Sequence, residues 1–204
     1  MYDALANCKD GDTVTLIADF KVTGNTSEDR LVITHKITFD FGNYFIKGAG
    51  ALSRDESYNF TILFVDADTT FVAKNGGIFS EDDTENNECG PYAVNVRNAA
   101  TLTIESGAYH GGGTAVQVQE GKLVINGGKF SVTPYADERY GYKYQINAID
   151  AAFKDGSAQI VIRGGSFYKF DPANSKSENP RGEFTDENYT VNCVDEWYTV
   201  VPRK

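Results

Sequence analysis

One sequence pattern occurs three times between Tyr92 and Phe170, and this internal repeat restricts the fold more than any other feature of the chain. Each copy has an alternating apolar segment, a turn, a second apolar segment and a bend of small residues that ends in an aromatic ring. The copies are Ala93-Val94-Asn95-Val96 with Leu102-Thr103-Ile104 and Ser106-Gly107-Ala108-Tyr109, then Ala115-Val116-Gln117-Val118 with Leu123-Val124-Ile125 and Gly127-Gly128-Lys129-Phe130, then Ala148-Ile149-Asp150-Ala151 with Ile160-Val161-Ile162 and Gly164-Gly165-Ser166-Phe167. A period of roughly 20 to 50 residues is typical of solenoids, in which a repeat buries its apolar face only against its neighbours.

The spacing of apolar residues within each segment predicts strands rather than helices. Apolar side chains at i and i+2 give a strand one inward and one outward face, and the branched inward residues suit a pleated surface. A Gly-Gly pair before an aromatic ring predicts a bend with positive φ that the ring closes. We therefore predict two short strands and a bend per repeat, stacked as a parallel β-helix.

The two ends of the chain depart from the repeat. The pattern from Tyr2 to Lys9 predicts a short helix, which would cover the first strand edge and keep it from pairing with a neighbour. After Phe170 the period is lost, and Tyr189–Val191 and Trp197–Val201 read as two closing strands. These features divide the chain into an N-terminal cap (1–12), a β-helix (13–170) and a C-terminal cap or oligomerisation segment (171–204).

The charge and the cysteines exclude several classes of protein. The formal net charge of −10 argues against nucleic acid or an anionic membrane as a partner, because both require a basic patch. No apolar run approaches the roughly 18 residues of a spanning helix, so we expect no membrane insertion. Cys8, Cys89 and Cys193 lie far apart and in odd number, which predicts neither a disulfide framework nor a zinc site.

An acidic segment at Ser80 to Cys89 is the candidate metal site. Glu81, Asp82 and Asp83 could supply the carboxylate oxygens that calcium prefers. The segment lacks the spacing of an EF-hand loop and the glycine-rich nonapeptide of calcium-binding repeats. A solvated acidic loop is the alternative interpretation, and no other cofactor is predicted.

A second insertion, Val132 to Gln145, is the candidate ligand-binding segment. Insertions in a solenoid emerge as loops and often carry the binding function. Rigid rings with hydrogen-bonding tips suit a sugar or a protein partner, although the same rings could instead shield the wall of the solenoid. The candidate residues are Tyr135, Arg139, Tyr140, Tyr142 and Tyr144.

The outward positions of the repeats are where catalytic groups would lie. A glycosidase needs two carboxyl groups across a groove, but Asn95 and Gln117 occupy the outward position that Asp150 takes in the third copy. No carboxylate stack is therefore predicted, and no catalytic residue is assigned. His110, beside three glycines, is interpreted as a histidine of a surface turn.

The run Ala4-Leu5-Ala6-Asn7-Cys8-Lys9-Asp10-Gly11-Asp12-Thr13-Val14-Thr15-Leu16 resembles the entry to pectate-lyase-like right-handed β-helices. The segments Gly164–Tyr168, Phe170–Asn174 and Glu196–Val201 are similar to the ends of β-helix proteins from gut bacteria and their phages. The resemblance implies that the β-helix winds in the right-handed sense. The enzyme motifs of this superfamily, Asn-Thr-Asp, Asp-Asp with Gly-His-Gly, and Trp-Ile-Asp-His, do not occur in the chain.

Together these features predict an all-β fold, a single-stranded right-handed parallel β-helix with a short N-terminal capping helix and a C-terminal β cap. The resemblance to phage fibre and spike proteins implies a non-enzymatic virion surface or extracellular protein: a head fibre, decoration or tail-spike domain. It would form a homotrimer, contact other virion proteins and present loops to a host glycan or receptor. A polysaccharide lyase or hydrolase and a bacterial surface adhesin are the alternatives.

Overall fold

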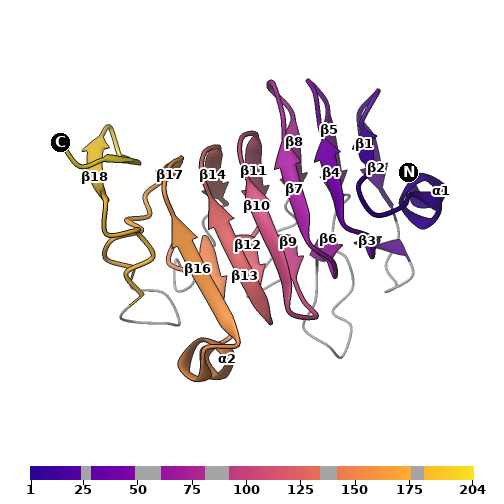
Figure 1. Cartoon of the computed structure of the whole chain (residues 1–204). Helices are drawn as coiled ribbons and strands as arrows, with labels where there is room; N and C mark the ends of the chain where they lie inside the picture. Colours follow the sequence, from indigo (N-terminus) through magenta and orange to yellow (C-terminus); the bar gives the residue numbers. More distant parts are fainter. Residues whose placement is uncertain (24–28, 49–60, 81–91, 134–141, 176–181) are drawn as a thin grey trace.

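A computed structural model describes residues 1–23, 29–48, 61–80, 92–133, 142–175 and 182–204 (Figure 1). In these ranges the chain forms short strands in three sheets and two six-residue helices, α1 (Tyr2–Asn7) and α2 (Asp150–Asp155). Strands that are far apart in the sequence stand side by side, and the two termini lie at opposite ends of the row (Figure 1). The chain therefore builds its body in one direction, from α1 to the C-terminal strands.

Successive strands go to the three sheets in turn, so that each strand pairs in parallel with the strand three further along the chain. Sheet A contains β1 (Thr13–Thr15), β4 (Ile37–Asp40), β7 (Thr69–Val72), β10 (Ala100–Ile104), β13 (Gly121–Ile125) and β16 (Ala158–Ile162). Sheet B contains β2 (Phe20–Val22), β5 (Phe45–Gly48), β8 (Gly77–Ser80), β11 (Ala108–Gly111), β14 (Lys129–Val132), β17 (Ser166–Tyr168), β19 (Trp197–Pro202) and β18 (Tyr189–Val194). Sheet C contains β3 (Leu31–Ile33), β6 (Thr61–Val65), β9 (Tyr92–Val96), β12 (Thr114–Val118) and β15 (Ile146–Ala148). The last two strands of sheet B, β19 and β18, pair antiparallel.

The predicted fold class, an all-β single-stranded right-handed parallel β-helix, is wrong. The strands form three separate parallel sheets rather than one solenoid of two-strand repeats, and α2 interrupts the repeat region. The prediction missed the third strand of each repeat because the Gly-Gly-aromatic segments were interpreted as bends. Lys129–Val132, for example, is a full strand of sheet B.

The register within sheet A is the part of the repeat that the sequence predicted correctly. Leu102 pairs with Leu123, which pairs with Ile160, so the three second segments of the repeat stack in line. The first segments of the first two copies also stack as expected, since Asn95 pairs with Gln117. The third copy does not, because Gln117 pairs with Asn147. Asp150 therefore begins α2 instead of occupying the outward position of sheet C.

The core is a column of apolar side chains enclosed by the sheets. Tyr109, Phe130 and Phe167 point inward from successive strands of sheet B, and their rings stack at centroid distances of 5.4 and 4.8 Å. All three are at most 1% exposed. Parallel strands lie about 4.8 Å apart, so identical positions place flat rings at stacking distance. The aromatic residue of each repeat thus fills the core instead of closing a bend.

Both ends of the column are closed by chain segments. Leu5 of α1 is buried against the core, and the ring of Tyr2 meets Phe20 edge-on at 5.8 Å. At the other end, Tyr198 of β19 pairs with Phe167 and packs against the core. The short helix predicted at the start of the chain is confirmed.

The turns between sheets A and B need glycine because neighbouring backbones touch there. A Cβ atom on Gly164 would lie 2.1 Å from the carbonyl oxygen of Asn126, and one on Gly127 would lie 2.4 Å from that of Glu105. Gly165 in addition has φ of +94°, which L side chains rarely adopt. The Gly-Gly pairs thus allow successive turns to stack at strand spacing.

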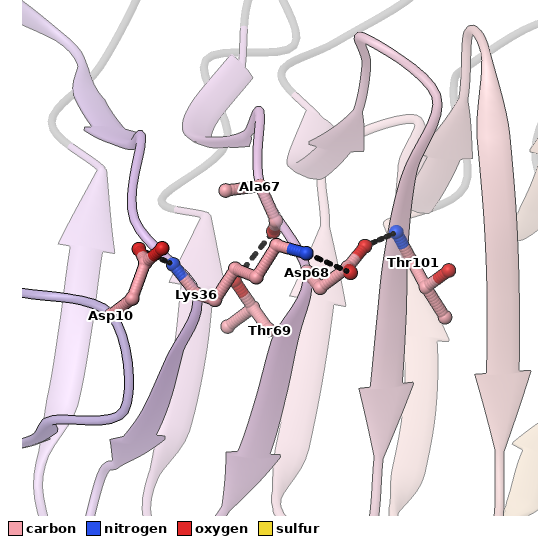
Figure 2. A network of polar contacts seen from close by, with 6 residues as sticks. All are labelled: Asp10, Lys36, Ala67, Asp68, Thr69 and Thr101. Carbon is pink, nitrogen blue, oxygen red and sulfur yellow. Dashed lines mark hydrogen bonds and ion pairs between the residues drawn. The ribbon is translucent and has the colours of Figure 1, made fainter.

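Carboxylates at the entry to sheet A join one turn to the next (Figure 2). The carboxylate of Asp10 accepts a hydrogen bond from the Lys36 N–H at 2.9 Å, and that of Asp68 accepts one from the Thr101 N–H at 2.9 Å. Lys36 Nζ also lies 3.3 Å from the Asp68 carboxylate. The Thr101 N–H, helped by Lys36, lowers the pKa of Asp68 below its ordinary value. These contacts give hydrogen-bond acceptors to backbone N–H groups at the start of strands of sheet A, where pairing within the sheet begins.

Candidate ligand-binding face

The predicted ligand segment is only partly within the described residues. Tyr135, Arg139 and Tyr140 lie outside them, whereas Tyr142 and Tyr144 lie inside and are half-buried. The backbone of Tyr142 has φ of +54°, an uncommon conformation for a residue with a side chain. This conformation accompanies a ring that packs on sheet B, against Tyr168.

Three aromatic side chains form a cluster at the C-terminal end of sheet B, which we call the aromatic platform. Tyr142 meets Tyr168 edge-on at 5.7 Å, and Tyr168 lies 5.4 Å from Trp197 at a tilt of 47°. All three are half-buried, so each ring has a packed part and a solvated part. Tyr168 and Trp197 are paired residues of β17 and β19, which places both rings on one face of the sheet.

A charged pair borders the aromatic platform. Lys169 Nζ lies 3.3 Å from the Glu196 carboxylate, 5.1 Å from the centre of the Tyr142 ring and 5.5 Å from that of Tyr168. The hydroxyl of Tyr168 donates a hydrogen bond to Glu196 at 3.1 Å. The hydrogen bond to Glu196 raises the pKa of Lys169, so the amine stays charged beside the rings. The platform therefore offers ring faces together with a fixed cation and a fixed anion.

A groove of about 590 Å³ runs beside the platform on the outer side of sheet B. Small residues lie along it where the backbone turns from sheet A to sheet B, and polar side chains flank them. The small residues are Gly107, Ala108, Gly128 and Gly165, and the polar ones are Lys74, Asn75, Ser106, Lys129, Ser166 and Thr199. Among the described residues that line the groove, none carries a carboxylate.

The groove and the aromatic platform belong to one continuous face. Ser166 and Tyr168 are two residues apart in β17, and Thr199 and Trp197 are two residues apart in β19. Alternate residues of a strand point to the same side, about 7 Å apart. The Ser166 and Thr199 hydroxyls are hydrogen-bonded at 2.9 Å where the groove meets the platform. We call this combined surface the binding face.

The sequence prediction missed most of the binding face. The repeat pattern predicts Trp197 in a closing strand and Tyr168 and Lys169 at the end of a repeat, with nothing to join them. They come together only because β19 folds back antiparallel on β17, which joins residues 28 positions apart, as in the Tyr168–Glu196 contact. The alternation of Ser166 with Tyr168 and of Trp197 with Thr199 is the one signal that could have indicated a shared face.

His110 does not lie in a surface turn, so that prediction is wrong. It lies within β11 and is half-buried, with Nδ1 2.8 Å from the Ser131 hydroxyl and Nε2 2.9 Å from the Thr133 hydroxyl. Its ring stacks on Phe79 at 4.7 Å. Burial lowers the pKa of His110 below its ordinary value, which favours the neutral ring.

A second hollow, of about 480 Å³, lies on the outer face of sheet A. Thr38, Thr70 and Thr103 stack along it in register, and the Lys36–Asp68 ion pair borders it. Cross-strand threonine pairs stabilise a sheet by themselves. Its two charged groups, Lys36 and Asp68, are paired with each other, and the described residues that line it include no aromatic ring.

The outward positions of sheet C carry amides rather than acids. Asn95, Gln117 and Asn147 stack in register, and the side-chain N–H of Asn147 donates to Gln117 Oε1 at 3.0 Å. All three are at most 5% exposed. The third position of this stack is Asn147 and not Asp150, the residue that the repeat alignment predicted there.

The predicted calcium site, Glu81, Asp82 and Asp83, lies outside the described residues. Within the described ranges, no three histidine, cysteine or acidic side chains are grouped so that they could hold a metal ion. The described helices include none with the length and apolarity needed to cross a bilayer.

The chain was compared with known proteins at three levels. It matches no protein-family model, no curated protein and no solved structure.

Proposed function

We propose that this protein is a glycan-binding protein whose ligand lies on the outer face of sheet B, across the aromatic platform. The observation that carries the proposal is the grouping of Tyr168, Trp197 and Tyr142 beside the Lys169–Glu196 pair. A sugar ring has an apolar face that packs on an aromatic ring and an equator of hydroxyl groups that needs donors and acceptors. The platform supplies both kinds of group within one surface.

The rigidity of the support favours binding by a preformed site. Tyr168 and Trp197 stand on paired strands, and backbone hydrogen bonds fix both, including Lys169 N–H to Glu196 O at 2.7 Å. A ligand that meets preformed rings does not have to order them, so less conformational entropy is lost on binding. The sheet that carries them contains six further strands.

The setting that we propose is the surface of a phage virion, as a non-enzymatic fibre, decoration or spike domain. This part of the proposal is supported by the sequence resemblance to β-helix proteins of gut bacteria and their phages. A body of stacked parallel strands that grows in one direction would suit a stiff projection carrying a ligand site near its C-terminal end. The glycan would then be a host-surface glycan.

Trp197 is the only tryptophan of the chain, so its fluorescence reports on the platform directly. We expect a host-type oligosaccharide to change this fluorescence in a saturable titration. The substitution Tyr168→Ala should weaken the affinity about twofold to tenfold, because an aromatic contact contributes about 0.5–1.5 kcal/mol.

The matched control is Phe79→Ala, which removes an outward ring from β8 of the same sheet, with β11 and β14 between it and β17. This variant should bind as the unmodified protein does. An affinity that is unchanged in Tyr168→Ala, or reduced equally in Phe79→Ala, would refute the assignment of the platform.

A further inference from the structure

We infer that the groove beside the aromatic platform selects glycans that carry anionic groups, with Lys74 and Lys129 as the residues that recognise the charge. This inference rests on the proposed glycan binding and assigns a ligand class to it. The protein as a whole carries a net charge of −10. A groove with two lysines and no described carboxylate in its lining is therefore a local exception.

The two lysines differ from the other cations near by in having no acidic partner. Lys47 is paired with Asp19, and Lys169 with Glu196. Within the described part of the chain, Lys74 and Lys129 make no ion pair, and both side chains are exposed. Their charges are thus available to a ligand without the loss of an existing salt bridge.

The positions of the lysines suit a chain-like ligand with repeated charges. Lys74 precedes β8 and Lys129 begins β14, with β11 between these strands. Two strand spacings, roughly 10 Å, separate β8 from β14 across the sheet, and Lys74 lies three residues before Gly77, the residue of β8 in line with Lys129. A ligand that spans both lysines would cross Ala108 and Gly107, where the lack of long side chains lets it approach the backbone.

Between the lysines and the aromatic platform, the groove is lined by the neutral hydroxyl groups of Ser166 and Thr199. In the Ser166–Thr199 pair, one hydroxyl proton is used between the two side chains, which leaves the other available to a ligand. Beyond this pair, on the same face, lie Tyr168 and Trp197. An acidic oligosaccharide could thus place its charged groups on the lysines and one ring on the platform.

The test is calorimetric titration of the full chain with two matched pairs of oligosaccharides. Dextran and dextran sulfate differ in sulfate esters, and hyaluronan and its carboxyl-reduced form differ in carboxylates. The charged member of at least one pair should bind more tightly than its neutral partner, and the pair that shows the difference identifies the anion. Its affinity should fall as salt is added, because exposed charges are screened.

Variants assign the effect to the groove. In Lys74→Gln/Lys129→Gln, each lost contact should weaken binding of the charged ligand by up to about fivefold, while the neutral partner is unaffected. The control Lys9→Gln/Lys122→Gln removes the same charge from elsewhere on the chain and should bind like the unmodified protein. An equal loss in both double variants would mean a general charge effect and would overturn the inference.

Two other outcomes separate this inference from the function on which it rests. If charged and neutral members bind equally and Tyr168→Ala weakens both, the selection for anions is wrong and the glycan-binding proposal stands. If no oligosaccharide of either pair binds and none changes the fluorescence of Trp197, both are overturned for these ligands.

Discussion

Phe79 and Phe130 follow the same Asn-Gly-Gly-x-Phe motif, yet they have opposite fates in the structure. Lys129 pairs with Ala108, which pairs with Gly77, so that Phe130 aligns with Ile78 and not with Phe79. A one-residue shift reverses the direction of a strand side chain. Phe130 is consequently fully buried, whereas Phe79 is 42% exposed on the outer face.

This difference predicts very unequal costs for the same substitution. Phe130→Ala removes a ring that packs between Tyr109 and Phe167, and the loss of burial plus the cavity should lower the free energy of unfolding by about 3–5 kcal/mol. Phe79→Ala removes a ring that contacts His110 at the surface and should cost less than about 1 kcal/mol. Guanidinium chloride unfolding, followed by circular dichroism, measures both.

A second variant keeps the test informative if Phe130→Ala does not fold. Phe130→Leu retains most of the volume and should cost about 1.5 kcal/mol or less. A double-mutant cycle with Phe167→Leu should give a coupling of about 0.5–1.5 kcal/mol, since the rings are stacked at 4.8 Å and 10°. If Phe79→Ala cost as much as Phe130→Ala, the one-residue offset between β8 and β14 in sheet B would be refuted.

Three further predictions concern electrostatics and assembly. Burial lowers the pKa of His110 in the folded protein, so unfolding takes up a proton as the pH falls. The stability that the neutral ring contributes is therefore present above the ordinary histidine pKa and is lost as the pH falls through the lowered pKa of the folded state. In acid, the melting temperature of His110→Asn should consequently fall less steeply than that of the unmodified protein. Arg97 makes a bidentate contact with Asp66 at 2.8 Å and lies over the Phe64 ring at 3.7 Å. Arg97→Lys keeps the charge but not the planar guanidinium, so it should lower the free energy of unfolding by about 1 kcal/mol in the same assay. An unchanged unfolding midpoint would contradict this account. The homotrimer implied by the resemblance to fibres and spikes predicts a light-scattering mass three times that of the 22.4 kDa chain at all dilutions, and a monomer would contradict that expectation.

The sequence predicted the strands of sheet A and their register well because local signals agree there. In Leu102-Thr103-Ile104 and its two counterparts, alternation, β-branching and flanking turns all indicate the same structure. The third strand of the repeat was missed where these signals conflict. Lys129 follows two glycines, and a charged residue after Gly-Gly is equally typical of a turn.

The first segment of the third copy shows a different limit. Two overlapping segments each place a polar residue between apolar ones: Ala148-Ile149-Asp150-Ala151 and Ile146-Asn147-Ala148. The insertion before them breaks the repeat period, so the spacing does not indicate which of the two segments forms the strand. The structure selects the earlier frame, in which Asn147 continues the amide stack of Asn95 and Gln117. A carboxylate at that buried position would lose its hydration, which costs free energy. The alignment that places Asp150 in the stack would carry this desolvation cost, whereas the alignment with Asn147 avoids it.

The binding face could not have been predicted from any local pattern, because it is made by chain reversal. Up to β17, every pairing in sheet B joins a strand in parallel to the strand three further along the chain, and the outer side chains of these strands include Lys47, Phe79, His110 and Ser131. The antiparallel return of β19 then places Trp197, Thr199 and Glu196 beside Tyr168, Ser166 and Lys169. The departure from the repeat is thus what brings the aromatic and charged groups together. We infer that the C-terminal hairpin both closes the core, through Tyr198, and completes the proposed ligand site, through Trp197 on the opposite face of the same strand.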